Sequence, residues 1–184
     1  MIFFGHLGTG ALIGLLGARG CPRLDERFLL AGAAGPDLLD KPLGEIFFRD
    51  TFQSGRSLGH TLLAAAVLAA AGWRDHKDRG RAELLSLGIG WCSHLIVDRM
   101  GDRPVVLFWP LLGRFRPPEP QGNICARMAV YLTDYSLAGS ELLGLAALLG
   151  LARRRGITGA TSAARFILEP PSYARAGGGD PARM

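Results

Sequence analysis

Residues 84–98 read LLSLGIGWCSHLIVD, an apolar run that ends with two side chains that are unfavourable to bury, His94 and Asp98. The run is apolar nearly all round, which predicts a buried or membrane-embedded helix. A spacing of four residues places His94 and Asp98 on one face of that helix. Such a pair could be two ligands of a metal ion or a structural hydrogen-bonded pair, and the run alone does not separate these alternatives.

Four further apolar segments accompany this one, and together they predict an all-α fold. They cover residues 2–18, 28–36, 60–73 and 137–152, and we expect the second to end at Pro36-Asp37. Leu, Ala and Gly dominate and β-branched residues are few, which favours helices over sheet. We expect an up-down bundle of about five helices, embedded in or associated with a membrane. A helix of about 16 residues spans only ~24 Å of a ~30 Å hydrocarbon core, so full crossing stays open.

The composition and net charge indicate which classes of partner the chain could bind. The 184-residue chain is 48% hydrophobic with a formal net charge of +5, and its mean hydropathy is +0.20. The basic excess indicates an anionic neighbour, either a membrane surface or a nucleic acid. No basic motif interleaved with aromatic residues is present, so we expect membrane lipid and no nucleic acid. The three cysteines match no zinc or redox spacing. No Lys or Arg precedes the first apolar segment, which we expect to be retained as a helix.

Two regions outside the apolar segments have distinct compositions. Residues 99–123 are Pro-rich and place Phe108 and Trp109 between arginines, which is typical of a loop at a membrane interface. Residues 156–184 form a basic tail rich in Gly and Pro, and we expect it to be largely disordered beyond a short helix within SAARFILEPP. The sequence therefore predicts one helical domain, residues 1–155, followed by this tail.

The unusual polar residues fall at alternating ends of successive apolar segments. If the five helices run up and down with short connections, these residues all converge at one end of the bundle. The set comprises His6, Asp37, Asp40, His60, His94, Asp98 and Glu141.

The opposite end is basic. It carries 13 of the 21 Lys and Arg residues, including Arg153, Arg154 and Arg155. The positive-inside rule places that end in the cytoplasm. We therefore expect a multi-pass protein of the inner membrane, with the cluster of histidines and carboxylates on the extracytoplasmic face.

Histidines and carboxylates converging from several helices predict a site for a divalent metal. Zinc is the expected ion, with manganese and iron as alternatives. We expect one or two ions, and six or seven ligands would suit a two-metal site. Such a site activates water and stabilises the leaving oxygen in phosphoester hydrolysis. We expect the histidines to supply nitrogen ligands and Asp37 and Asp98 oxygen ligands, with Asp40 as a bridging ligand or the general base.

Structural explanations compete with the metal ligands at several positions. Asp40 could pair with Lys41 or Arg49, and Glu141 could interact with the dipole of its own helix. Arg56 could bind a substrate phosphate as a catalytic residue, or it could be a surface arginine that faces lipid headgroups. A non-catalytic membrane protein whose cluster only locks the helices together is the alternative to a hydrolase.

Five short motifs occur in a recognisable order: GHLGTG, GPDLLDKPLG, GRSLGHTLL, GWCSHLIVD and VVLFWPL. Over residues 1–152 the chain resembles the YdjM-like family of membrane-bound, metal-dependent hydrolases. The resemblance implies hydrolysis of a bond in a small-molecule, lipid or lipid-linked substrate by a metal-activated water. Ligand positions of the family are matched by His6, Asp37, His60, His94 and Asp98, and less closely by Asp40.

The chain departs from the family pattern at one histidine. Many members carry an additional histidine before the position of His60, whereas this chain has Gly55 there. The substitution removes one nitrogen ligand, and it therefore weakens the expectation of a second metal ion more than that of the first.

Overall fold

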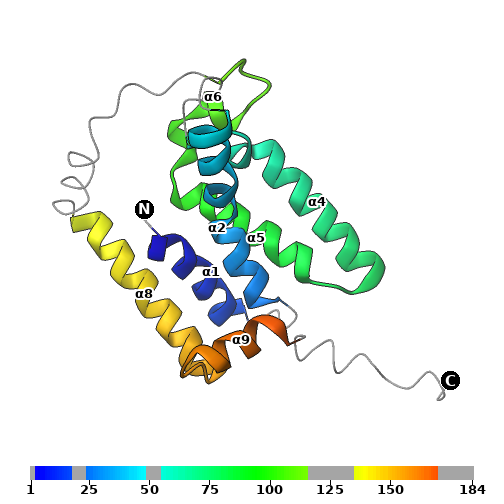
Figure 1. Cartoon of the computed structure of the whole chain (residues 1–184). Helices are drawn as coiled ribbons and strands as arrows, with labels where there is room; N and C mark the ends of the chain where they lie inside the picture. Colours follow the sequence, from blue (N-terminus) through cyan, green and yellow to red (C-terminus); the bar gives the residue numbers. More distant parts are fainter. Residues whose placement is uncertain (1–2, 18–23, 49–54, 116–134, 170–184) are drawn as a thin grey trace.

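The computed structural model describes residues 3–17, 24–48, 55–115 and 135–169 (Figure 1). Every regular element in these ranges is helical, which confirms the all-α prediction. Each of the five apolar segments corresponds to one long helix. These helices are α1 (Phe3–Gly17), α2 (Glu26–Pro42), α4 (Leu62–Arg79), α5 (Glu83–Val97) and α8 (Tyr135–Arg155).

Short elements fill the connections. The single turns are η1 (Leu43–Phe47), η2 (Leu58–His60) and η3 (Met100–Asp102). The start of the Pro-rich loop contains α6 (Pro104–Leu107), and the remainder of that loop from residue 116 lies outside the described residues. The short helix expected in the basic tail is confirmed as α9 (Ala160–Leu168), whereas the predicted disorder concerns residues 170–184, which are not described.

The second helix is longer than predicted. The expectation that it ends at Pro36-Asp37 is wrong, because α2 continues through Pro36 to Pro42. A proline inside a helix removes one backbone hydrogen bond. Tertiary contacts compensate here, since the side chain of Asp40 binds the turn at residues 57–60 and the backbone of Gly59 packs against Pro36. Asp37 and Asp40 therefore project from one continuous helix.

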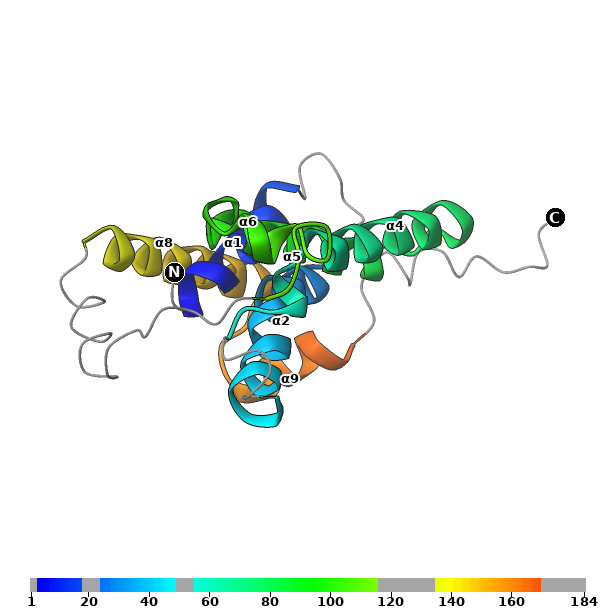
Figure 2. The same cartoon turned by 90° about the horizontal axis from the view of Figure 1, so that it is seen from above.

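Each long helix packs closely against one or two of the others. α8 packs on α1, α1 on α2, α2 on α5, and α5 on α4. Figure 2 shows α8, α1, α5 and α4 side by side, with α2 and α9 lying to one side of them. Successive long helices run in alternating directions, so the starts of α1 and α4 and the ends of α2 and α5 lie toward one side of the molecule (Figure 1).

Glycines allow these close contacts. A Cβ atom on Gly32 of α2 would lie 2.1 Å from the carbonyl oxygen of Leu87, and one on Gly90 of α5 would lie 2.3 Å from that of Leu29. Between α1 and α8, a Cβ on Gly8 would lie 2.1 Å from the Cα of Gly144. Small residues that let helix backbones approach are characteristic of helix packing in membranes.

One helix in the described part of the chain, α8, is long and apolar enough to cross a membrane by length and composition. Its 21 residues extend about 31 Å, which matches a hydrocarbon core of about 30 Å. The helices α1 and α5 are apolar but shorter. Leu142, Leu143 and Leu149 of α8 are exposed, so much of its apolar surface is not covered by the rest of the described chain.

We predict that Gly144→Ala destabilises the protein. The new methyl group would lie 2.1 Å from the carbonyl oxygen of Phe4, so α8 must move away from α1. Overpacking of this kind costs about 1–3 kcal/mol. Thermal unfolding of the purified protein in detergent measures the effect.

Gly139→Ala on the same helix is the matched control, because a Cβ at Gly139 has no neighbour within 4 Å among the described residues. This variant should unfold at the wild-type temperature or slightly above it, since Ala favours helix over Gly. Equal unfolding temperatures for both variants would contradict the close α1–α8 contact.

Candidate metal centre

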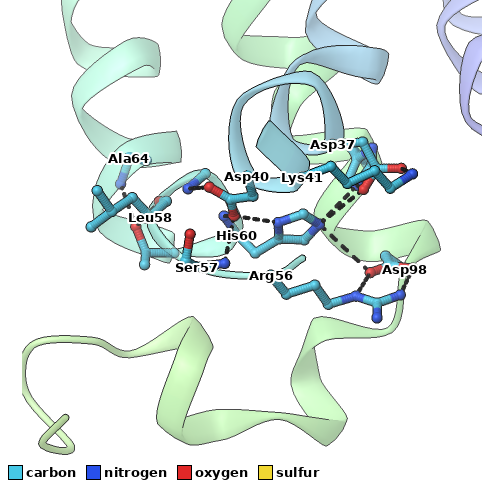
Figure 3. Close-up of polar contacts among 12 residues, drawn as sticks. Asp37, Asp40, Lys41, Arg56, Ser57, Leu58, His60, Ala64 and Asp98 are labelled. Carbon is cyan, nitrogen blue, oxygen red and sulfur yellow. Dashed lines mark hydrogen bonds and ion pairs between the residues drawn. The ribbon is translucent and has the colours of Figure 1, made fainter. Parts of the chain in front are cut away.

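The carboxylate of Asp40 organises the turn that carries His60. Its Oδ2 accepts hydrogen bonds from the backbone N–H groups of Ser57 (2.6 Å) and His60 (3.1 Å), and its Oδ1 accepts one from Gly59 (2.8 Å). Oδ2 also lies 2.7 Å from Nδ1 of His60 (Figure 3). Hydrogen bonds of this kind favour the charged form of a carboxyl group. Asp40 is therefore ionised, and His60 donates its Nδ1–H to it.

His94 is oriented by a different acceptor. It lies in the last turn of α5, and its Nδ1 is 2.7 Å from the carbonyl oxygen of Ala33 on α2. A carbonyl oxygen can only accept a hydrogen bond, so Nδ1 of His94 carries a proton. The ring is buried, which favours its neutral form. Its Nε2 therefore presents a lone pair.

The two Nε2 atoms face each other. Nε2 of His60 and Nε2 of His94 are 3.2 Å apart, and both rings are completely buried. Because each Nδ1 already donates its proton, neutral rings bring two lone pairs together without a hydrogen between them. A shared cation resolves this contact, and so does an additional proton on one ring. A histidine whose second nitrogen donates to a carboxylate or a carbonyl is the usual form of a metal ligand.

Two carboxylates complete the surroundings of these nitrogens. Nε2 of His60 lies 3.6 Å from Oδ1 of Asp37 and 3.8 Å from Oδ2 of Asp98, and Nε2 of His94 lies 3.9 Å from the same oxygen of Asp37. Ligands held 2.0–2.1 Å from one ion at tetrahedral angles lie about 3.3 Å apart. The observed separations are close to this value, so the donor atoms fit a metal ion with little movement.

Each of these carboxylates is also bound by a cation. Arg56 donates from Nε to Oδ2 of Asp98 (2.5 Å) and from Nη2 to Oδ1 (2.9 Å), and Lys41 lies 2.7 Å from Oδ2 of Asp37. Figure 3 shows the two ion pairs on opposite sides of the point that Nε2 of His60 faces. Burial would raise the pKa of Asp98, which follows the end of α5, but the bound Arg56 outweighs it and lowers that pKa. The ion pair with Lys41 likewise favours the charged form of Asp37. Both carboxylates are therefore charged and able to bind a metal.

His6 of α1 reaches the same place. Its ring stacks on that of His94, with ring centroids 4.0 Å apart. His6 is buried in this position. Two groups of side chains have donor atoms close enough to hold an ion: His6, Asp37 and His94, and His60, His94 and Asp98.

The predicted convergence brings five of the seven polar residues together, namely His6, Asp37, His60, His94 and Asp98. Asp40 lies behind them. It is fully buried and its oxygens accept hydrogen bonds from the turn, so this geometry does not support its prediction as a bridging ligand or general base. The alternative that Asp40 pairs with Lys41 is wrong, because Lys41 binds Asp37.

Glu141 belongs to neither group of donor atoms. Its carboxylate accepts hydrogen bonds from the backbone N–H groups of Phe4 (2.8 Å) and Gly5 (3.2 Å), at the start of α1. A negative charge stabilises the N-terminal end of a helix, and here it stabilises a neighbouring helix rather than its own. Glu141 thereby places the start of α8 beside the turn of α1 that carries His6.

Three features of the site were not predicted from the sequence. The first is the ion pair between Lys41 and Asp37, whose i,i+4 spacing in the sequence is a signal for such a pair. The bond from Arg56 to Asp98 joins residues 42 positions apart and has no local signal. The carbonyl of Ala33 is a backbone group, and side-chain patterns do not reveal its role.

Comparison with known proteins gives one family. A family model described as YdjM inner membrane protein matches residues 1–168. The match includes all five long helices and α9. Searches of curated proteins and of solved structures found no match.

We predict that Asp40→Asn weakens binding of a metal at the candidate centre, although Asp40 itself lies behind the candidate ligands. Asparagine has one acceptor oxygen, so it cannot accept from both His60 and the three backbone N–H groups. Loss of such a partner of a histidine ligand lowers metal affinity about 10–100-fold. Competition with a chelator of known affinity measures the change. Asp75→Asn, at an exposed ion pair on α4, is the control, and equal affinities in the two variants would refute the role of Asp40.

Proposed function

Because this chain belongs to the YdjM inner membrane protein family, we propose that it is a membrane-bound, metal-dependent hydrolase. The expected reaction is hydrolysis of a phosphoester or related bond in a lipid or lipid-linked substrate. The family description supports the membrane location, and the donor atoms of the candidate metal centre support the chemistry.

The observation that carries the proposal is the 3.2 Å contact between Nε2 of His60 and Nε2 of His94. The Nδ1–H of His60 donates to Asp40, and the Nδ1–H of His94 donates to the carbonyl oxygen of Ala33. The rings therefore cannot rotate to separate their lone pairs without breaking a buried hydrogen bond, which costs about 1–3 kcal/mol. Two neutral histidines fixed in this way are preorganised for a cation.

We propose one ion rather than two. The two possible groups share His94, and its only available nitrogen is Nε2, because Nδ1 is bound to Ala33. One nitrogen lone pair binds one ion, so the two groups are overlapping parts of a single site. The donors are imidazoles and carboxylates, which suit zinc first, and manganese or iron as alternatives.

The residues around the ion would have three different roles. His6, His60 and His94 would be nitrogen ligands and Asp37 and Asp98 oxygen ligands, while Asp40 fixes the orientation of His60. The ion, when bound, supplies activation of a water molecule for hydrolysis. Asp37 is 27% exposed and His60 and His94 are buried, so substrate and water would approach from the side of Asp37.

Exposed apolar side chains beside the site support a lipid or lipid-linked substrate. Ile46, Phe47 and Phe48 follow α2 directly, and all three are more than half exposed. They follow Lys41 by five to seven residues, so acyl chains could contact them while the polar part of a substrate reaches the metal. The orientation we propose places this site on the extracytoplasmic face. It is supported by Arg153, Arg154 and Arg155 at the far end of α8.

The alternative is a non-catalytic membrane protein whose cluster is structural. A proton on His60 would let its Nε2–H donate to Nε2 of His94, and the carboxylates of Asp37 and Asp98 near His60 suit a positive ring. The two functions differ in turnover. The hydrolase requires a bound metal ion and cleaves a substrate, whereas the structural cluster cleaves nothing and can hold either a metal ion or only a proton.

We predict that the purified protein contains about one divalent ion per chain and that His94→Ala loses it, because the shared ligand is removed. His76→Ala is the matched control, since His76 lies near the far end of α4, belongs to neither group of donor atoms and should be dispensable for metal binding. Elemental analysis of detergent-purified protein measures the metal, and a chromogenic phosphodiester measures hydrolysis. A folded wild-type protein without metal would favour the structural cluster.

We predict that the two ends of the helices are labelled from opposite sides of the membrane. Single cysteines replacing Ile46, near the site, and Asp78, near the end of α4, are exposed enough to react with a membrane-impermeant maleimide. In intact spheroplasts only position 46 should be labelled, and in inverted vesicles only position 78. Labelling of both positions from one side would reject the proposed orientation.

A further inference from the structure

We propose that Lys41 and Arg56 form a two-sided binding site for the anionic phosphoryl group of a phosphodiester, positioned at the metal. This inference rests on the proposed function and specifies its substrate class. Neither cation is a candidate metal ligand, yet each binds one of the carboxylates that are. The pairs Lys41–Asp37 and Arg56–Asp98 lie on opposite sides of the point that Nε2 of His60 faces (Figure 3).

The exposure of the two pairs indicates which partner faces the substrate. The Lys41 side chain is 57% exposed and that of Asp37 is 27% exposed, and the Arg56 side chain is 32% exposed against 4% for Asp98. In both pairs the carboxylate points inward to the histidines and the cation lies outward. The accessible edge of the site is therefore lined by positive charge on two sides.

The net charge of the site also favours a phosphodiester as the substrate. Three carboxylates (Asp37, Asp40, Asp98) and two cations (Lys41, Arg56) leave one net negative charge when the histidines are neutral. One divalent ion reverses this to one net positive charge. A phosphodiester carries a single negative charge, so it neutralises the loaded site, whereas a neutral carboxylic ester leaves the charge uncompensated. Charge balance in a partly buried site favours the phosphodiester.

The geometry of the ligand also matches two cations. A phosphodiester has two oxygens that carry no ester substituent, and both accept hydrogen bonds. Lys offers three N–H donors, of which the bond to Asp37 uses one, and Arg is suited to planar recognition of phosphate oxygens. Binding these oxygens from two sides would fix the phosphorus next to the metal. Hydrolysis then breaks one P–O ester bond and forms one P–O bond to the oxygen of water. One water proton goes to the departing alcohol and the other to solvent.

The test uses the full-length protein loaded with cobalt, whose visible spectrum reports ligands at the metal without requiring turnover. Titration with dimethyl phosphate, a monoanion, should change the spectrum, whereas neutral trimethyl phosphate should have no effect. Lys41→Met should weaken dimethyl phosphate binding about tenfold with unchanged cobalt content, because one charge-assisted hydrogen bond is lost. Lys41→Arg should restore most of the affinity.

Arg79→Met is the matched control, because Arg79 is an exposed cation that pairs with Asp75 at the far end of α4. It should bind dimethyl phosphate like the wild type. Arg56→Lys provides a second variant, since it keeps the charge but loses the paired bonds to Asp98, and it should weaken binding by a similar factor. A cobalt-loaded Lys41→Met variant with wild-type affinity for dimethyl phosphate would overturn this inference alone. A wild-type protein that binds no cobalt would overturn the proposed function as well.

A second arm identifies the source of the phosphodiester. A short-chain phosphatidylglycerol and its deacylated headgroup carry the same phosphodiester and differ only in their acyl chains. Tighter binding of the lipid would assign the site to lipid headgroups, in keeping with the exposed Ile46, Phe47 and Phe48. Equal binding would assign it to a water-soluble phosphodiester, and failure of both to bind cobalt-loaded protein would overturn the inference.

Discussion

The buried carboxylate of Asp40 is the interaction on which the site depends. It accepts hydrogen bonds from three backbone N–H groups of residues 57–60 and from His60, and it has no exposed surface. A buried charge is stable only when it is fully paired, so α2, the turn and the start of α4 must be in place together. The same contact extends α2 past Pro36. The helix that presents Asp37 and the turn that presents His60 are therefore fixed by one group.

The site also depends on close helix packing at glycines. The ring of His94 can reach the carbonyl of Ala33 because α5 and α2 approach through Gly32 and Gly90. The stack of His6 on His94 depends in the same way on the position of α1, which Gly8 holds against α8. Glycine lowers the intrinsic stability of a helix by about 1 kcal/mol per residue. The backbone proximity that these glycines allow brings candidate ligands from four elements to one place.

Sequence patterns predicted the helices well because apolar segments are local signals. All five long helices were expected, and their bounds differ mainly where a charged extension continues the helix, as in α4 after residue 73. Pro36 does not end the second helix as predicted, since tertiary contacts compensate for a proline that is otherwise unfavourable inside a helix. Alternation of the polar residues along the chain predicted that five of them lie close together, because successive helices reverse direction.

The sequence by itself determined which residue types are available and toward which end of the helices they lie. Only the tertiary structure decided what each one does. Asp40 and Asp98 are both aspartates near the end of an apolar helix, yet Asp40 binds a buried turn and Asp98 faces the histidines. Glu141 stabilises the start of α1 instead of joining the cluster. These roles depend on distances between residues far apart in the chain, and such distances are set by helix packing, which no local pattern encodes.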